Sequence, residues 1–536
     1  MKVYQNLKKA IAFLFLFLWL FIQINLLVTQ NFVSQITKRD FALPNVALLC
    51  IGIATVVLVS VIGIWLYRRY HAQIEKLISF KMVVLLSVLL FFFQLYLSYH
   101  VYFITDWDVQ LVINNATLLN QGEVSPDFPY YYSRYPNNLF LTYLYALIMK
   151  VGAWLGMGEG NVFSIVAVQC AISAVTAYLT YRVTYSFTNS KWMSLFAYAV
   201  YAVFIGVSPW FVIPYSDATG LVFPIAIFRM WQIAKKTERR SVQYVLYAVM
   251  GVLAFIGFKI KPQILIVFIA LLMIVLIKTL LVLIKERRAW QVAARYAACL
   301  GAFVLSAALF SGVISMIIPQ KLDPEREYGM AHFLMMGLNE ERQGIYSDED
   351  VAFSASFETK EERSAANLEV VRQRLREMGI GGLFKHLVNK TLVNFGDGSF
   401  AWHQEGIFLK EILPEKDENL SPFFRSFYYA NGKNYGAFLT YSQYIWMAIL
   451  FFAAFSAIYA VKSQAQKGDE MSVLLLALIG LTLFETLFEA RARYLFTYAP
   501  IFIVCAVVGL YVILKAVRKK ANEKSCLACH NFYNVA

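Results

Sequence analysis

The sequence VVLLSVLLFFFQLYLSY, residues 83–99, is followed seven positions later by the acidic triplet Asp106-Trp107-Asp108. An apolar run of this kind predicts a membrane-spanning helix, because about 20 apolar residues cross a hydrocarbon core of about 30 Å. Carboxylates have no part in apolar packing, and at the mouth of a span they mark a pathway, a ligand or a reacting group. The junction therefore predicts a membrane fold with a polar site at one face.

The composition of the whole chain agrees with a membrane protein. Of its 536 residues, 59% are hydrophobic and 16% aromatic, which excludes a soluble multidomain protein of ordinary composition. The net charge of +14 comes from Lys and Arg clusters between apolar runs, a distribution that reports topology and argues against nucleic acid. We predict an all-α polytopic membrane protein in the plasma membrane of a bacterium, with membrane lipids and no nucleic acid among its partners.

Thirteen stretches approach the length of a span, but one of them conflicts with the charge pattern. If the basic N-terminus is cytoplasmic, a crossing by residues 138–156 places later basic clusters, such as Lys235-Lys236 and Arg287-Arg288, outside. Because the positive-inside rule forbids this, we predict that 138–156 is an interfacial helix. About twelve transmembrane helices remain, with both termini cytoplasmic: 9–29, 44–66, 81–101, 161–181, 191–208, 217–234, 242–258, 262–285, 294–318, 436–461, 471–488 and 494–515.

The predicted organisation combines three membrane regions with two polar ones. The first membrane region, 1–80, contains two additional N-terminal spans. The second, 81–318, is a core with a catalytic external loop at 102–160, and the third, 436–515, contains the last three spans. The polar regions are a mainly helical extracytoplasmic insertion at 319–435 and a basic cytoplasmic tail at 516–536. The insertion is thus predicted to lie on the same side as the acidic triplet.

One helix of the insertion is well defined by its ends. Thr359-Lys360-Glu361-Glu362 has the capping-box pattern of a helix start, and Gly379 is suited to end the helix. The following amphipathic stretch, 383–395, is compatible with a helix on the bilayer surface.

With this topology, polar residues at the ends of several spans are predicted to meet on the outer face. Lys259, Lys261, Arg491 and Arg493 are basic, on the side where positive charge is disfavoured, and this calls for a ligand. The candidate catalytic residues are Asp106 and Asp108, and the candidate substrate-binding residues are Arg134, Tyr135, Asp217, Lys259, Lys261, Glu489, Arg491 and Arg493.

These residue types suit transfer of a sugar from a lipid phosphate. Lys and Arg bind phosphate, Arg through a planar bidentate fork and Lys as a point charge. A carboxylate nearby can remove the proton of an acceptor hydroxyl while the cations stabilise the departing phosphate. Glycosyl transfer combines both requirements, since the sugar passes through an oxocarbenium-like state.

The chain resembles the GT-C membrane glycosyltransferases, particularly the protein O-mannosyltransferase-like branch, over about residues 81–515. The features that carry the resemblance are the acidic pair of the first large external loop, the interfacial helix, Pro214-Tyr215-Ser216-Asp217, the Lys259 and Lys261 turn, and Glu489-Ala490-Arg491-Ala492-Arg493-Tyr494. The resemblance implies a polyprenyl-phosphate sugar donor. The chain departs from the family pattern because two additional spans precede its acidic loop.

The resemblance also implies roles for individual residues. An acidic residue of the first external loop is the catalytic base or holds the acceptor, which maps to Asp106 or Asp108, and basic residues of the last external turn contact the lipid phosphate. Our first choice for the base is Asp106, with Asp108 assisting and the insertion selecting a glycan, lipid or protein acceptor. Lys259, Lys261, Arg491 and Arg493 are expected to receive the phosphate. A divalent cation is a possible cofactor that two carboxylates alone do not require.

Other readings of these residues stay open at the level of sequence. Asp217 suits a helix N-cap, Arg134 and Tyr135 suit an aromatic belt, and Arg491 can pair with Glu489. Two other functions also fit a polytopic chain with external charges. They are a lipid-linked glycan flippase or transporter, which should carry charges within its spans, and an oligosaccharide polymerase, which would use a diphosphate-linked donor.

Overall fold

The computed structural model describes residues 2–29, 41–158, 160–283, 289–317, 322–405 and 409–533. Within these ranges it is almost entirely helical, as predicted, and ten helical segments are long and apolar enough to cross a membrane. These segments are Lys2–Val28, Asn45–Arg69, Phe80–Val101, Phe163–Thr188, Arg240–Ile260, Pro262–Leu281, Ala289–Val313, Tyr435–Lys462, Gln466–Leu487 and Ala492–Lys520. The all-α polytopic membrane class is therefore confirmed.

Eleven of the described helices provide these segments, together with short 3-10 or π-helical turns. Their bounds are α1 Lys2–Val28, α2 Asn45–Arg69, α4 Phe80–Val101, α8 Phe163–Thr188, α12 Arg240–Ile260, α13 Leu265–Lys278, α14 Ala289–Ile317, α20 Tyr435–Ala454, α21 Ser456–Lys462, α22 Ala465–Leu487 and α23 Ala499–Tyr533. A short helix, α3 (His71–Leu77), connects α2 with α4.

Two of the twelve predicted spans are helices shorter than a membrane crossing. The predicted spans 191–208 and 217–234 correspond to α9 (Lys191–Phe204) and α11 (Phe223–Lys236), each of 14 residues. Proline interrupts the chain between them, because Pro209 and Pro214 lack the backbone N–H that a continuous helix needs. The interruption holds a 3-10 turn at Pro209–Val212 and the five-residue helix α10 (Ser216–Gly220), all of whose residues are buried.

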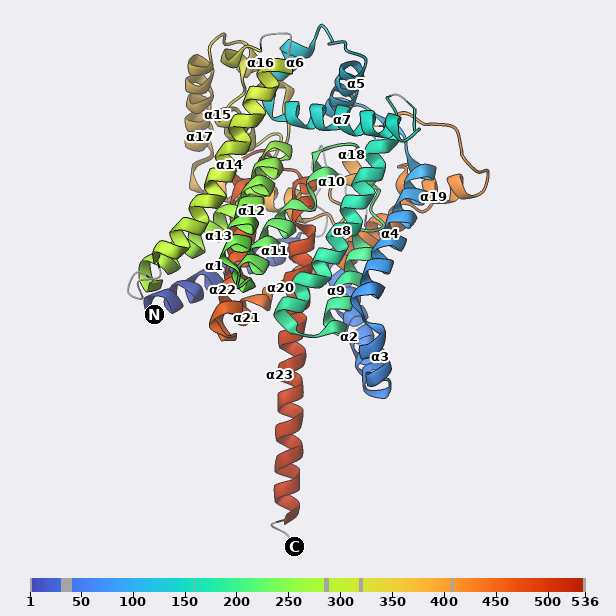
Figure 1. Cartoon of the computed structure of the whole chain (residues 1–536), viewed down its shortest axis with the longest axis vertical. Helices are drawn as coiled ribbons and strands as arrows, with labels where there is room; N and C mark the ends of the chain where they lie inside the picture. The colour runs from blue at the N-terminus through green and yellow to red at the C-terminus, as the bar shows by residue number, and fades with distance from the viewer. Residues whose placement is uncertain are drawn as a thin grey trace.

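The predicted interfacial helix lies across the bundle. Helix α7 (Leu139–Trp154) runs across the upper ends of the long helices in Figure 1. Helices α5 (Trp107–Asn120) and α6 (Phe128–Arg134) lie at the same end. The segment after the acidic triplet therefore forms a cap over one end of the bundle.

The polar insertion also belongs to this end, and its described part is mainly helical, as predicted. Its helices are α15 Met330–Gly337, α16 Asp348–Ala355, α17 Lys360–Phe395, α18 Trp402–Glu405 and α19 Leu420–Tyr428. Its strand β2 (Leu409–Glu411) pairs antiparallel with β1 (Ile104–Thr105), the two residues that precede Asp106. The insertion thus holds the chain just before the acidic triplet.

The ends predicted for the insertion helix are confirmed. The Thr359 hydroxyl accepts a hydrogen bond from the Glu362 amide at 3.2 Å. Gly379 leaves helical geometry with a φ of 58°, so α17 consists of two helices that meet at a kink, and the first of them ends there. The stretch 383–395 does not lie on a surface, because its His386 and Lys390 side chains are buried against Gly337. Amphipathic spacing alone does not separate a protein-facing helix from a bilayer-facing one.

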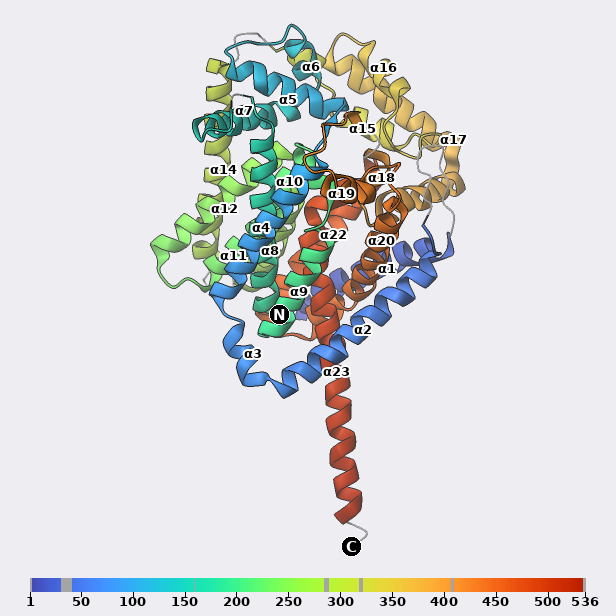
Figure 2. The same ribbon diagram turned by 90° about the vertical axis from the view of Figure 1, so that its right-hand side faces the viewer.

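The two additional N-terminal spans join the bundle in different ways. Helix α1 is fixed by a buried ion pair of 3.1 Å between Lys8 and Asp469 of α22, and by a 2.7 Å hydrogen bond from the Trp19 indole to the Leu450 carbonyl. Helix α2 runs obliquely along the outside of the bundle (Figure 2) and packs mainly on α20. The centre is formed by α23, which packs against α20, α8 and α21 and extends beyond the bundle at the lower end (Figures 1 and 2).

Candidate active site

The acidic triplet is held in an unusual backbone conformation. Trp107 has a φ of 60°, which residues other than glycine adopt rarely. Such a conformation costs roughly 1–3 kcal/mol and persists only where the surrounding structure fixes it. Here the paired strand β1 precedes Trp107 and helix α5 starts with it, so the turn is clamped on both sides.

The two acids of the triplet lie in different surroundings. Asp106 occupies the N-cap position of α5, and its side chain is 63% exposed and 3.9 Å from Lys410 of the insertion. Asp108 lies in the first turn of α5, half-buried, and accepts a hydrogen bond from the Tyr215 hydroxyl at 3.5 Å. The strained turn therefore directs one carboxylate to the surface and the other into the protein.

Asp108 is surrounded by tyrosines from separate parts of the chain. Burial, followed by the charge of Asp108, raises the pKa of Tyr131 and of Tyr215. Burial, and then the charges of Asp348 and Asp108, raise the pKa of Tyr346 in the insertion to about 12. Tyr135 packs between Tyr131 and Tyr328, and its pKa is raised by burial, Tyr328 and Asp108. The carboxylate thus faces neutral phenols that can donate hydrogen bonds.

Below this acid, Asp217 organises a buried ion cluster. Its carboxylate is 1% exposed, forms an ion pair with Lys261, and accepts a hydrogen bond from Arg493 Nη1 at 3.1 Å. Lys261 and Arg493 are also buried. Since two cations share one carboxylate, this group of three keeps one formal positive charge. Asp217 was expected at a span start; the prolines of the preceding segment instead place it inside the bundle.

Arg493 connects this cluster with the acidic triplet. Its guanidinium carbon lies 4.5 Å from the ring centroid of Trp107 and 5.4 Å from that of Tyr215. Cation–π contacts of this kind are stronger when the cation is removed from water. The structure therefore brings together the first large loop, the Pro-Tyr-Ser-Asp segment, the Lys261 turn and the last turn before α23, four regions far apart in the sequence.

Glu489 and Arg491 lie at the edge of the same region. Their closest charged atoms are 3.8 Å apart, and both side chains are largely buried. The next residue, Ala490, donates its amide to the Gly344 carbonyl of the insertion at 2.7 Å, which places this segment beside the insertion.

Two predicted site residues lie elsewhere. The Lys259 ammonium is 5.3 Å from the ring centroid of Phe310 in α14, although Lys261, two positions on, belongs to the Asp217 cluster. Arg134 stacks on Tyr130, with 3.7 Å between its guanidinium carbon and the ring centroid, and its carbonyl accepts the Tyr328 amide at 3.1 Å. Lys259 thus faces α14, and Arg134 faces the surface and the insertion.

Several residues of the site were not selected from the sequence. Trp107 lies between the selected residues Asp106 and Asp108, and Tyr215 lies two positions before the selected residue Asp217. This proximity in the sequence was the signal that could have identified both aromatic residues. Glu485 is fully buried in α22, and among the described residues neither of its carboxylate oxygens has a hydrogen-bond partner. Lys390 donates to the Gly337 carbonyl at 2.9 Å, and burial lowers its pKa to about 7, against the opposing charges of Glu485 and Glu489. No sequence signal joined Lys390 to this region, because its helix appeared to be a surface helix.

The described residues do not form an obvious metal site. No group of three or more His, Cys, Asp or Glu side chains gathers within them in a way that holds an ion. Asp106 and Asp108 also point to different surroundings, so they do not form a shared pair of ligands. We therefore assign no step to a metal.

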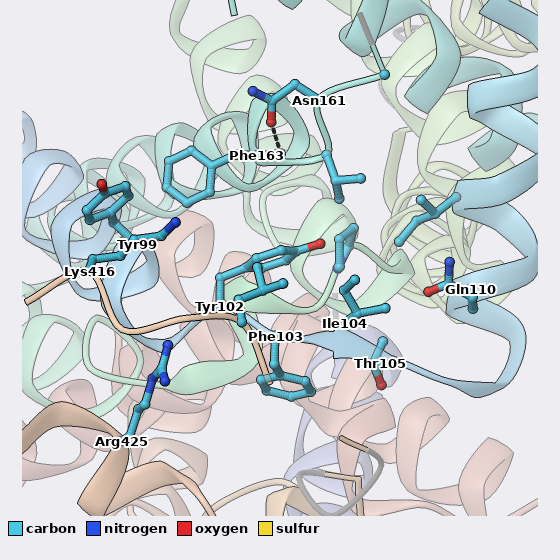
Figure 3. A pocket seen from close by; sticks show the side chains of 15 residues that line it. Tyr99, Tyr102, Phe103, Ile104, Thr105, Gln110, Asn161, Phe163, Lys416 and Arg425 are labelled. Atoms are coloured by element: carbon cyan, nitrogen blue, oxygen red, sulfur yellow. Dashed lines mark hydrogen bonds between the residues drawn. The ribbon is translucent and has the colours of Figure 1, made fainter. Parts of the chain in front are cut away.

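A cavity of about 520 Å³ is lined in part by Thr105, which precedes the acidic triplet, and by Pro214, which precedes Tyr215. Figure 3 shows Tyr102 and Phe163 on its sides, Thr105 and Gln110 at one end, and Lys416 and Arg425 of the insertion at the other. Arg425 is anchored by donation from Nε to the His100 carbonyl at 2.9 Å. The cavity combines aromatic walls with a few fixed polar groups, which is typical of small-ligand sites.

The fold and the site define a multi-pass membrane protein with a buried ion cluster beneath an acidic, aromatic loop. The chain belongs to the family described as conserved hypothetical integral membrane protein, whose model matches residues 3–511. No curated protein matches the sequence.

A solved structure that matches is the archaeal oligosaccharyltransferase AglB from Archaeoglobus fulgidus, in complex with an inhibitory peptide and a dolichol-phosphate. The two chains share 11% identity at a TM-score of 0.38, over 82% of this chain and 52% of the other. The chain thus spans about half the length of that enzyme. At this score the likeness establishes no common function.

Proposed function

We propose that the protein is an integral membrane glycosyltransferase that moves a sugar from a polyprenyl-phosphate donor to an acceptor at the face covered by α5–α7. The observation that carries this proposal is the position of Arg493, which reaches from the buried Asp217 to the ring of Trp107, between the two acids. A cation that can meet a phosphate therefore lies beside a carboxylate that can act as a base. By the charge pattern of the sequence, this face is extracytoplasmic.

We assign the base to Asp108 in preference to Asp106. Asp108 lies on the inner side of the strained turn among the tyrosines, whereas Asp106 is mostly exposed. In the reaction, the acceptor oxygen forms a bond to the anomeric carbon of the sugar while the bond from that carbon to the phosphate oxygen breaks. The acceptor proton passes to Asp108, and the electron pair leaves with the phosphate.

The phosphate is received by Arg491 and Arg493. Because Asp217 holds Arg493 and Lys261 in fixed positions, the cations need no rearrangement as negative charge develops on the leaving group. Tyr135 is a neutral donor for the sugar hydroxyls, since burial raises its pKa, whereas the Tyr215 hydroxyl donates to Asp108 and can accept from them. Glu489 orients Arg491, and the membrane holds the polyprenyl chain.

The aromatic cavity is assigned to the acceptor. It adjoins the triplet through Thr105, and the insertion supplies Leu413, Lys416 and Arg425 to its wall. Aromatic side chains stack on sugar rings, and fixed polar groups give orientation. The insertion would then select the acceptor, as expected from its place in the sequence.

The experiment uses the purified full chain in nanodiscs with a panel of labelled polyprenyl-phosphate hexoses and pentoses and a membrane glycan extract as acceptor. Transfer of label with release of polyprenyl monophosphate is expected, and D108N should lower the rate by roughly 10²–10⁴-fold, the usual contribution of a general base. D323N, at an exposed ion pair of the insertion, serves as the matched control and should retain activity. Full transfer by D108N would overturn the assignment.

One observation favours a second candidate, a flippase or transporter. Asp217, Lys261 and Glu485 are charged groups buried inside the bundle, where a transport path would place them. Movement of a labelled lipid-linked sugar across the bilayer without cleavage would support this function. Release of a diphosphate lipid from a diphosphate-linked donor would instead identify a polymerase.

A further inference from the structure

A second polar cavity lies at the end of the bundle opposite to the acidic triplet. It has a volume of about 1180 Å³ and is lined by the C-terminal end of α8, the turn between α21 and α22, and α23. These elements meet at the lower end of the bundle in Figure 1, away from α5–α7. Its basic lining residues are Lys462, Lys467, Lys515, Arg518 and Lys519.

One wall of this cavity is a single face of α23. Tyr511, Val512, Lys515, Arg518 and Lys519 recur at spacings of three and four, so they lie on the same side of the helix. The apolar members come first and the basic members follow. The wall therefore changes from apolar to cationic along the direction in which α23 leaves the bundle.

The cavity lies at the depth of lipid headgroups. Lys515 is the first charged residue after Arg493, 22 positions earlier. In helical geometry this separation is about 33 Å, close to the thickness of the hydrocarbon core. Because Arg493 belongs to the site at one face, Lys515 marks the other face.

Other cations at the same end of the bundle form ion pairs with buried acids. Lys235 pairs with Glu470 at 3.3 Å, and Asp469 pairs with Lys278 at 2.7 Å and with Lys8 at 3.1 Å. None of the described residues that line the cavity is Asp or Glu. Lys467 is fixed by donation to the Phe187 carbonyl at 2.9 Å and to the Asn189 side chain at 3.2 Å, both uncharged. Like charges gathered in this way are stabilised by an external anion.

We propose that this cavity binds the phosphate headgroup of an anionic phospholipid from the leaflet on the side of the basic tail. The phosphate lies among Lys515, Arg518 and Lys519, and an acyl chain follows the apolar wall formed by Tyr511, Val512 and Ile458. Basic pockets between spans bind phosphate headgroups in this way, and each cation near the surface strengthens the attraction. This site is independent of the proposed glycosyl transfer.

The test is native mass spectrometry of the full chain with equimolar dioleoyl phosphatidylglycerol and dioleoyl phosphatidylcholine. The wild-type protein should retain phosphatidylglycerol preferentially, and K515Q/R518Q/K519Q should lower that retention by roughly tenfold or more. The control R239Q/R240Q removes two exposed cations that do not line the cavity, and it should bind like the wild type.

Because the three substituted side chains are exposed, the triple variant should retain the fold. Thermal unfolding of each variant in detergent checks this. Equal retention of both lipids by the wild type, or unchanged retention by the triple variant, would overturn the proposal. Displacement of the lipid by millimolar inorganic phosphate would also overturn it, because the ligand would then be a soluble phosphate.

Discussion

The inner and outer sides of the acidic turn carry the same residue types in opposite environments. On the outer side, Asp106 and Lys410 are 63% and 53% exposed and 3.9 Å apart. On the inner side, Asp217 is buried 3.1 Å from Arg493, which stacks on Trp107 beside Asp108. Exposed ion pairs contribute little, whereas removal of one partner of a buried pair leaves an uncompensated charge. Substitutions on the two sides should therefore differ sharply.

The largest effect is expected for D217N. This change leaves Lys261 and Arg493 buried without their shared carboxylate, at a cost of about 3–5 kcal/mol. Thermal unfolding in detergent should show a large fall in Tm, and glycosyl transfer should be lost. D323N, at an exposed pair with Arg326, is the matched control and should unfold like the wild type. An unchanged Tm for D217N would mean that the ion cluster does not organise the bundle.

The next effect concerns catalysis without stability. D108N keeps the size of the side chain and the hydrogen bond from Tyr215, but removes the base. The transfer rate should fall by roughly 10²–10⁴-fold, while Tm and the affinity for polyprenyl phosphate stay close to wild type. A parallel fall in Tm and rate would assign Asp108 a structural role.

The buried Lys390 predicts a dependence of stability on pH. Its pKa is lowered by burial to about 7, whereas in the unfolded chain it is about 10.4. Between these values the unfolded state binds more protons, so the free energy of unfolding should rise with pH above 7, by about 2 kcal/mol up to pH 9.

K390M removes the titrating group and should remove this increase. Unfolding temperatures of both proteins measured from pH 6 to pH 9 provide the check. Parallel curves for wild type and K390M would show that the lysine is not desolvated as described.

The smallest effect is expected for D106N. The carboxylate faces solvent and its partner Lys410 is also exposed, so the rate should stay within about threefold of wild type and Tm should not change. Transfer assays and unfolding curves run beside D108N measure this directly. A severe loss in D106N would return the base to the outer acid, the residue first favoured from the sequence.

Much of the fold followed from hydropathy and charge. The apolar runs predicted the long helices, and the charge pattern separated 138–156 from them; this segment is now α7, which lies across the ends of the long helices. The shortness of α9 and α11 was missed, although Pro209 and Pro214 lie in the sequence between them. Proline breaks a helix locally, but hydropathy averaged over a window does not register the break.

The site could be predicted only in part, because residue type does not determine burial. The sequence grouped Asp108, Asp217, Lys261 and Arg493, which the structure brings near one another. It could not separate Lys259 from Lys261, whose side chains diverge where α12 ends. Lys390 and Glu485 depend on packing between the insertion and α22, and such long-range contacts leave no local pattern.

The most direct measurement is the single-turnover release of polyprenyl monophosphate by wild type, D106N and D108N, prepared and assayed together. A base at Asp108 predicts that D106N stays within about threefold of wild type and that D108N is slower by roughly 10²–10⁴-fold. The opposite order, or equal rates for all three proteins, would contradict a catalytic base on the inner side of the turn.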